Sequence, residues 1–385
     1  MKALRRIWAV IKKETLHITR DKVMLMICFL APIFLTVLFG FVYINQKVTN
    51  IPIVIYDADK TDLSRTIISG FNDSERLEVI KYAETYDELK KEIEENRAQM
   101  GIIIPPNMKK TVKSGQSSEV GIIYNGTNTL IMSTAGTAAN QVVGTISAGI
   151  NIKIMQGTGI SSKKAMNAVQ ALAFKSRTWY NPTASYGPFM LLGLLATILQ
   201  QLAFLAVALS FSRERESGAW KNLVFSKLKS KEIILGKFLV YLVIFFVDAI
   251  IMYSIAVRFF QIPQVGNLNL LLLLFLVFLV SVLMLGIFLS AIIKSQVQAI
   301  EISMIIAVPS FILSGYSWPA FSMPKALQYV SNALPLTHFL NGTKSVMYMG
   351  QGYGVIRNDV RYLIGLGLLF LPINIFLVSR RMKKS

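Results

Sequence analysis

The stretch RERESGAWKNLVFSKLKSKEIILGK, residues 213–237, decides the fold, because it is a charged island between two long apolar runs. It contains seven Lys or Arg residues and three Glu residues. Charged side chains in this number do not remain in hydrocarbon, and the neighbouring runs are too apolar to remain in water. The sequence therefore predicts that the island lies at a membrane surface and that the runs on both sides cross the membrane.

The composition of the whole chain agrees with a membrane protein. Of its 385 residues, 53% are hydrophobic and 16% are charged, whereas about 25% of residues are charged in soluble domains. The single cysteine, Cys28, excludes a disulfide within the chain, and the two histidines, His17 and His338, are far apart. There is no GxxxxGK[ST] phosphate-binding loop and no Ser/His/Asp grouping. We therefore expect no catalytic residue, no metal and no cofactor bound by this chain.

Six apolar runs are predicted to span a bilayer, whose hydrocarbon core of about 30 Å takes roughly 20 helical residues. They are residues 23–44, 185–212, 238–257, 268–293, 299–314 and 362–379. Before the first run, residues 1–22 are basic and amphipathic, and one helical face carries Leu4, Ile7, Trp8, Ile11 and Ile18. This pattern predicts a helix that lies in the membrane interface.

Residues 45–180 differ from the rest, because charges of both signs return, with 16 Lys or Arg against 13 Asp or Glu. Apolar runs at 51–57, 100–106 and 119–125 predict three strands, and 85–99 and 128–176 predict helices. The predicted fold class is a polytopic α-helical membrane protein with six transmembrane helices. An α+β extracytoplasmic domain is expected between the first and second helices.

The distribution of basic residues predicts the orientation. Nineteen of the 40 Lys and Arg residues, with only five acids, lie in the segments 1–22, 212–237, 294–298 and 380–385. The positive-inside rule places these segments in the cytoplasm. Both termini are then cytoplasmic, at the inner membrane of the cell, and residues 45–180 and 315–360 are outside. The basic charge indicates topology and contact with anionic lipid, not nucleic acid.

Four polar residues interrupt the predicted spans: Gln200, Gln201, Asp248 and Glu301. A charged side chain at the bilayer centre costs about 2.5–3.5 kcal/mol on insertion scales, so it usually faces protein or water. They are candidates for a polar translocation path or an ion site. The alternatives are structural hydrogen bonds and, for Glu301, a position near the membrane surface.

Residues 315–360 contain Pro319, Pro324 and Pro335 and many aromatic residues. Irregular backbone at membrane depth is tolerated where protein buries it or water reaches it. A re-entrant pair of short helices that forms an extracellular gate fits this pattern. The alternative is an ordinary outside loop.

The island resembles the RExE-x-G…E-x-x-x-GK loop of ABC-2 type permeases, the membrane subunits of one class of ATP-binding-cassette transporters. RTWYNPTAS at 177–185 is similar to a segment of the drug-export branch, as is the proline-punctuated stretch 314–342. The order of elements over nearly the whole chain also agrees. The chain departs from the pattern at Ala219–Trp220, and at Ser226–Lys227 where a proline is usual.

The resemblance implies an exporter permease that works as a dimer with a second copy or paralogue. A separate nucleotide-binding ATPase subunit would bind ATP and Mg, and a hydrophobic or amphipathic compound would move outward. A periplasmic or extracellular accessory protein is a further partner. The coupling residues on the ATPase side are Glu214, Arg215, Glu216, Gly218, Trp220, Leu223 and Phe225. Of these, Trp220 and Leu223 are expected in a groove of the ATPase.

Two other functions fit the sequence. One is an ion-gradient-driven transporter that uses Asp248 and Glu301. The other is a membrane receptor or scaffold that moves no substrate and acts through residues 45–180.

Overall fold

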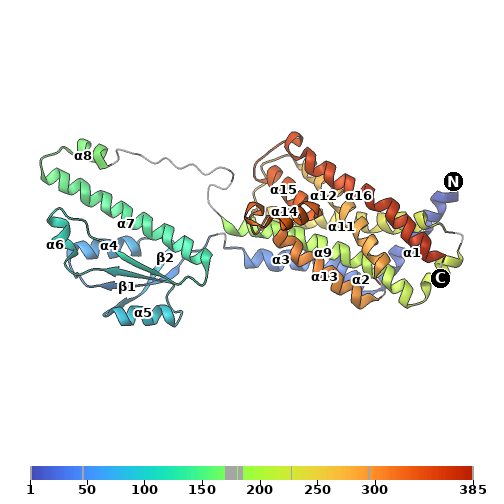
Figure 1. Cartoon of the computed structure of the whole chain (residues 1–385), viewed down its shortest axis with the longest axis horizontal. Helices are drawn as coiled ribbons and strands as arrows, with labels where there is room; N and C mark the ends of the chain where they lie inside the picture. The colour runs from blue at the N-terminus through green and yellow to red at the C-terminus, as the bar shows by residue number, and fades with distance from the viewer. Residues whose placement is uncertain are drawn as a thin grey trace. The chain divides into compact units, whose positions relative to one another are not determined.

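A computed structural model describes residues 2–45, 47–169, 180, 185–226, 228–293 and 295–383 (Figure 1). The chain forms two compact units. The helical unit comprises residues 1–46 and 178–385, and the sheet unit comprises residues 47–177. The predicted fold class, a polytopic helical protein with an α+β domain, is confirmed. The predicted segments at 170–176 and 177–184 lie outside the described residues, apart from Tyr180.

The sheet unit contains four strands in the order β2-β1-β3-β4. They are β1 (Ile51–Asp57), β2 (Leu77–Ala83), β3 (Met100–Ile104) and β4 (Gly121–Tyr124). β1 pairs in parallel with β2 and β3, and β4 is antiparallel to β3. β2 was not predicted from the sequence. Its side chains alternate between more and less exposed positions, with buried Leu77 and Ala83 at its two ends, as is typical of a half-exposed strand.

Helices cover both faces of this sheet. α4 (Asp62–Asn72) and α7 (Thr129–Gly157) share one apolar core with the sheet, and α5 (Tyr86–Glu94) contributes to a separate one. Two shorter helices are α6 (Met108–Lys113) and α8 (Ser162–Val169). The helix predicted over 128–176 is interrupted between α7 and α8, where Gly159 has a φ of +85°, a conformation that glycine adopts readily.

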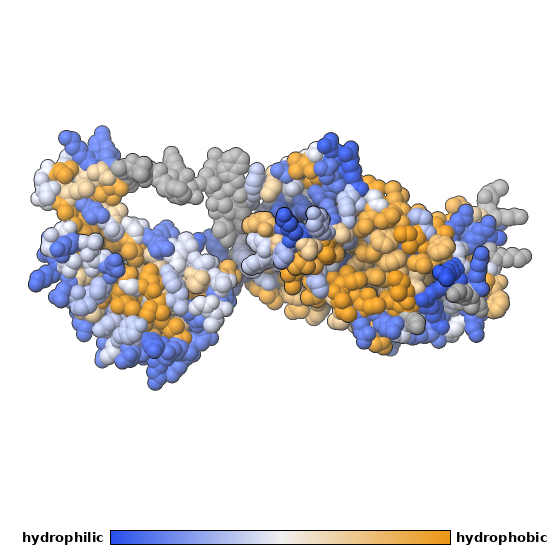
Figure 2. Space-filling model, viewed as in Figure 1, coloured by the Kyte–Doolittle hydropathy of each residue, from blue (hydrophilic) through white to orange (hydrophobic). Residues whose placement is uncertain are grey.

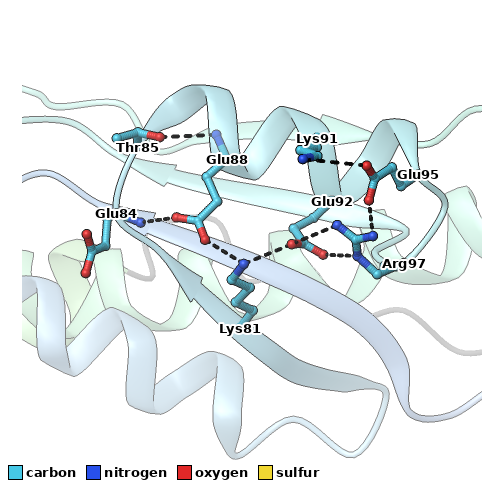
Figure 3. Close-up of polar contacts among 8 residues, drawn as sticks. All are labelled: Lys81, Glu84, Thr85, Glu88, Lys91, Glu92, Glu95 and Arg97. Carbon is cyan, nitrogen blue, oxygen red and sulfur yellow. Dashed lines mark hydrogen bonds and ion pairs between the residues drawn. The ribbon is translucent and has the colours of Figure 1, made fainter.

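A network of charges holds α5 to the sheet (Figure 3). The Nζ atom of Lys81 on β2 lies 3.0 Å from Oε1 of Glu92 and 2.5 Å from Oε1 of Glu88. Arg97 donates to both carboxylate oxygens of Glu92, at 2.6 and 3.1 Å. The hydrogen bonds from Arg97 and then Lys81 lower the pKa of Glu92 to about 2.

The helical unit contains six helical stretches, among the described residues, that are long and apolar enough to cross a membrane. The first joins α2 (Lys22–Leu25), a π-helical turn η1 (Met26–Leu30) and α3 (Ala31–Val42). The others are α9 (Tyr186–Glu216), α11 (Ser230–Arg258), α12 (Leu268–Ile292), α13 (Gln296–Leu313) and α16 (Tyr353–Met382). α9 and α12 are the most buried of the six, whereas α13 and α16 leave much apolar surface exposed. On the face that Figure 2 shows, a broad hydrophobic area lies over the middle of the helical unit.

This unit contains further helical segments besides these six stretches. They are α1 (Lys2–Arg20), α10 (Ala219–Phe225), the 3₁₀ turn η2 (Ala320–Ser322), α14 (Lys325–Ala333) and α15 (Pro335–Met347). The charged island is therefore mostly helical, because α9 continues to Glu216 and α11 already begins at Ser230. The Glu232 carboxylate accepts a hydrogen bond of 2.8 Å from the Lys229 backbone N–H, which caps the start of α11.

Candidate functional site: the junction of α1, α9, α10 and α11

The break between α9 and α10 is at Gly218. Its φ is +73°, and a Cβ atom added there meets nothing within 4 Å, so conformation rather than space favours glycine at this position. Because of this break, the predicted coupling residues divide between two helices. Glu214, Arg215 and Glu216 form the last turn of α9, and α10 carries Trp220, Leu223 and Phe225.

The side chains of α10 do not point as the sequence predicted. Trp220 and Leu223 are 5% and 7% exposed, because they pack into the core of the helical unit. The ring of Trp220 lies 6.5 Å from that of Phe211 on α9. The expectation that Trp220 and Leu223 enter a groove of a partner therefore does not agree with their burial. Phe225 is 80% exposed, and with exposed Lys221 and Asn222 it forms the outer face of α10.

A buried ionic cluster is centred on Lys237 of α11, and its charged groups lie on α1, α9 and α11 rather than on α10. Its Nζ atom lies 2.6 Å from Oε2 of Glu14 on α1 and 2.9 Å from Oε1 of Glu214 on α9. Nζ also donates to the hydroxyl of Ser210 at 2.6 Å and lies 5.0 Å from the centre of the Phe211 ring. The side chains of Lys237 and Glu14 are each 1% exposed. One ammonium group therefore joins α1, at the start of the chain, to α9 and α11.

Further polar groups complete the cluster. Oε1 of Glu14 accepts hydrogen bonds from Ser210 at 2.5 Å and from Tyr241 at 2.8 Å. Lys13, which is 39% exposed, pairs with Glu214. Burial by itself raises the pKa of Glu14, but the charge and hydrogen bonds of Lys237 outweigh this and lower the pKa below its ordinary value. Two carboxylates therefore face two ammonium groups, and the cluster is balanced in charge.

α1 approaches α11 closely at Gly236, the residue before Lys237. A Cβ atom at Gly236 would lie 2.6 Å from Cγ1 of Val10 and 3.3 Å from the backbone oxygen of Ile7. Only glycine fits that separation without displacing α1. The two residues of this GK pair thus have different roles. Gly236 allows α1 to approach α11 closely, and Lys237 pairs with the Glu14 carboxylate of α1.

A second set of contacts links the end of α9 to other helices. The Glu216 carboxylate accepts from the backbone N–H of Gln296 at the start of α13, at 2.8 Å. Arg213 donates to the Gln296 side chain at 2.8 Å and also pairs with Asp21, which caps α2. The guanidinium of Arg215 donates to Ser212 at 3.1 Å. The end of α9, which α10 follows after the break at Gly218, is therefore linked by polar contacts to α2 and α13.

The four polar residues predicted within the spans are not brought together by any hydrogen bond or ion pair between described residues. Gln200 is 1% exposed and Asp248 is 2% exposed. Neither polar atom of the Gln200 side chain has a partner in the described part of the chain, and the same is true of one oxygen each of Gln201 and Asp248. Glu301 lies on the exposed side of α13.

The three prolines of the predicted gate each precede or begin a helix. Pro319 precedes η2, Pro324 precedes α14, and Pro335 is the first residue of α15, where the missing N–H removes no helical hydrogen bond. Nδ1 of His338 on α15 lies 2.8 Å from Oδ1 of Asp359 on α16, which ties the two helices together.

Sequence reasoning missed Glu14, Ser210 and Tyr241 and considered Lys237 only as part of a motif. A signal was present for Glu14. It follows Ile7 and Ile11 and precedes Ile18 at helical spacing, so it is an acid on an otherwise apolar stripe. An acid in that position requires a buried cation, and Lys237 supplies it.

Comparison with known proteins identifies the family. The model of the family described as ABC-2 family transporter protein matches residues 22–376. The chain is 26% identical over 355 residues to the probable multidrug ABC transporter permease YbhR of Escherichia coli K12, covering 92% of this chain and 93% of that protein. It is 26% identical over 387 residues to the inner membrane transport permease YhhJ of the same organism, covering 97% and 96%. The chain is also 29% identical over 198 residues to ABC transporter G family member 20 of Dictyostelium discoideum. This match covers half of this chain and 26% of that protein. With six helices suited to crossing a membrane and a family match over most of its length, this multi-pass membrane protein belongs to the ABC-2 family of transporter proteins.

Proposed function

We propose that this permease is the transmembrane subunit of an exporter, driven by ATP hydrolysis in a separate nucleotide-binding subunit. It moves a hydrophobic or amphipathic compound outward, and two permease chains, identical or paralogous, enclose the path. ATP and Mg are bound by the partner. The Lys and Arg excess supports a cytoplasmic position for the island, both termini and α1. The sheet unit would then lie outside, where an accessory protein would have access to it.

The observation that supports the proposal is the buried cluster of Lys237, Glu14 and Glu214, which contacts α10 through the ring of Phe211. A helix that receives a push needs a rigid support, and charge pairs with almost no exposure resist separation. The exposed Phe225 is a suitable anchor for a partner, since aromatic side chains dominate the binding energy of protein interfaces.

The proposal is tested by co-purifying the permease with candidate nucleotide-binding subunits and measuring ATP hydrolysis and transport. Phe225→Ala should keep the fold and weaken association at least tenfold, because it removes an exposed aromatic anchor. Phe321→Ala is the matched control, since Phe321 is 86% exposed on η2, outside the island. If no ATPase subunit associates with the wild-type permease, the proposal fails.

One observation favours a second candidate, the ion-gradient-driven transporter. Asp248 is 2% exposed and one of its oxygens has no partner among the described residues, as expected for a carboxylate that takes up and releases a proton. Transport measured with the proton gradient collapsed and ATP held high separates the two. Continued transport supports the ATP-driven exporter, and loss of transport supports the second candidate.

A further inference from the structure

The sheet unit contains a cavity of about 380 Å³ between α4, α6 and α7. α4 forms one wall with Leu63 and Ile67, and α6 with the loop after it forms another. The third wall is the later part of α7, which follows the small residues that pack on the sheet. There Val143, Ser147, Ile150 and Ile154 follow one another at helical spacing along one stripe.

The lining of this cavity combines aliphatic with neutral polar side chains and contains no charged residue. Of the fifteen described residues that line it, nine are aliphatic or Met and none is Lys, Arg, Asp or Glu. A second recess of about 440 Å³ in the same unit is lined partly by Asp73, Glu75 and Arg76. Charged residues are thus common on this unit and absent from the lining of the first cavity, so a charged ligand would lose water there without gaining a counter-charge.

Neutral polar groups are available at the same site. They are the side chains of Gln116, Ser117, Ser118, Ser147 and Asn151. Ser147 and Asn151 lie one turn apart on α7 and are exposed to solvent, so they can exchange water for a hydroxyl or carbonyl group of a ligand. The volume falls at the lower end of the range for small-molecule sites, about 300–1,000 Å³. A protein partner would instead need a surface of roughly 800 Å².

We propose that this cavity binds an uncharged amphipathic small molecule, one with an apolar body and a single hydroxyl or carbonyl group. The inference rests on the proposed function, since it assigns to the sheet unit a site for the class of compound that the permease exports. The site also selects within that class, because its lining accepts neutral compounds and excludes both cations and anions.

Binding is tested on the full-length permease in lipid nanodiscs without any ATPase subunit, so the result does not depend on coupling. A bimane label on Lys153→Cys, an exposed position of α7, reports on the cavity, because the native Cys28 is buried. A label on Lys90→Cys of α5, which packs in the other apolar core, is the control for non-specific effects. The probes are naphthylmethanol, naphthylmethylammonium and naphthoate, which share one apolar body.

The expected result is a saturable bimane response to naphthylmethanol at position 153 only, at least tenfold tighter than to either ion. Ser147→Trp, which fills the mouth, should weaken binding at least tenfold. Gly149→Trp, on the opposite side of α7 with open space at its Cβ, should leave it unchanged. Ser147→Asp should invert the preference toward the cation. Equal responses to all three probes, no response, or equal loss in the two Trp variants would overturn the proposal.

Discussion

Replacing Lys237 by Met removes the positive charge at the centre of the junction while keeping most of the side-chain volume. The change leaves Glu14 and Glu214 buried together, with the partly exposed Lys13 still paired with Glu214. Removing one partner of a buried ion pair costs about 3–5 kcal/mol, because the remaining charge is uncompensated. We therefore expect Lys237→Met to reduce the free energy of unfolding by about 3–5 kcal/mol.

A double-mutant cycle separates this ionic term from packing. Glu14→Gln keeps the hydrogen bonds from Ser210 and Tyr241 within reach and leaves Lys237 paired with Glu214, so its cost is about 1–3 kcal/mol. When Glu14→Gln is combined with Lys237→Met, the Glu214 carboxylate remains and is still paired with Lys13. The double variant should therefore be more stable than the sum of the single changes predicts, with a coupling of about 0.5–3 kcal/mol.

The assay is equilibrium unfolding in mixed micelles at increasing SDS, followed by tryptophan fluorescence. Trp220 packs beside the cluster, on Phe211, so it reports on this region. The reasoning is refuted if Lys237→Met costs less than about 1 kcal/mol, far below the expected loss for a buried pair, or if the two changes add without coupling.

Three further predictions follow from other sites. Gly236→Leu should displace α1 and increase its hydrogen exchange, because a Cβ there lies 2.6 Å from Val10; Gly365→Leu on α16, where a Cβ meets nothing within 4 Å, is the control, and equal exchange in both would contradict the close approach. Glu92 has a folded pKa of about 2 against an ordinary 4.5, so its stabilisation is full above pH 4.5 and is lost as the pH falls toward 2. Exchange of α5 amides, corrected for intrinsic rates, should rise between pH 5 and 3 in the wild type but not in Glu92→Gln, and an identical rise in both would exclude Glu92 as the cause. Asp248→Asn should leave stability in SDS unchanged or raised, because it removes a buried charge with an unpartnered oxygen; a loss above about 1 kcal/mol would mean that the ionised group is stabilised by a group outside the described residues.

The membrane helices were predictable because length and hydropathy alone identify them. Six spans were expected, and the described part of the chain contains six suitable helices. Their ends were less predictable, since Arg213–Glu216 and Ser230–Lys237 look like loop residues in sequence. In the structure, Lys237 pairs with Glu14 of α1 and Arg213 donates a hydrogen bond to Gln296 of α13. These charged residues are therefore accommodated within α9 and α11.

The junction was only partly predictable for a different reason. A seven-residue helix such as α10 has an amphipathic pattern, but the sequence does not say whether its apolar face meets its own chain or another. Trp220 and Leu223 were assigned to a partner for this reason, and they are buried in the helical unit. The pairing of Glu14 with Lys237 joins residues 223 positions apart, and local spacing carries no information on such a contact.

We propose that α10 receives force from an ATPase subunit and that the buried cluster transmits this force to the membrane helices. The most direct measurement is photo-crosslinking from Phe225→Cys carrying a benzophenone, in the permease reconstituted with its purified nucleotide-binding subunit. The account predicts crosslinks to that subunit whose yield changes when ATP is added, and none from Phe321→Cys. Efficient labelling at position 225 without any crosslink, or equal yields from positions 225 and 321, would contradict it.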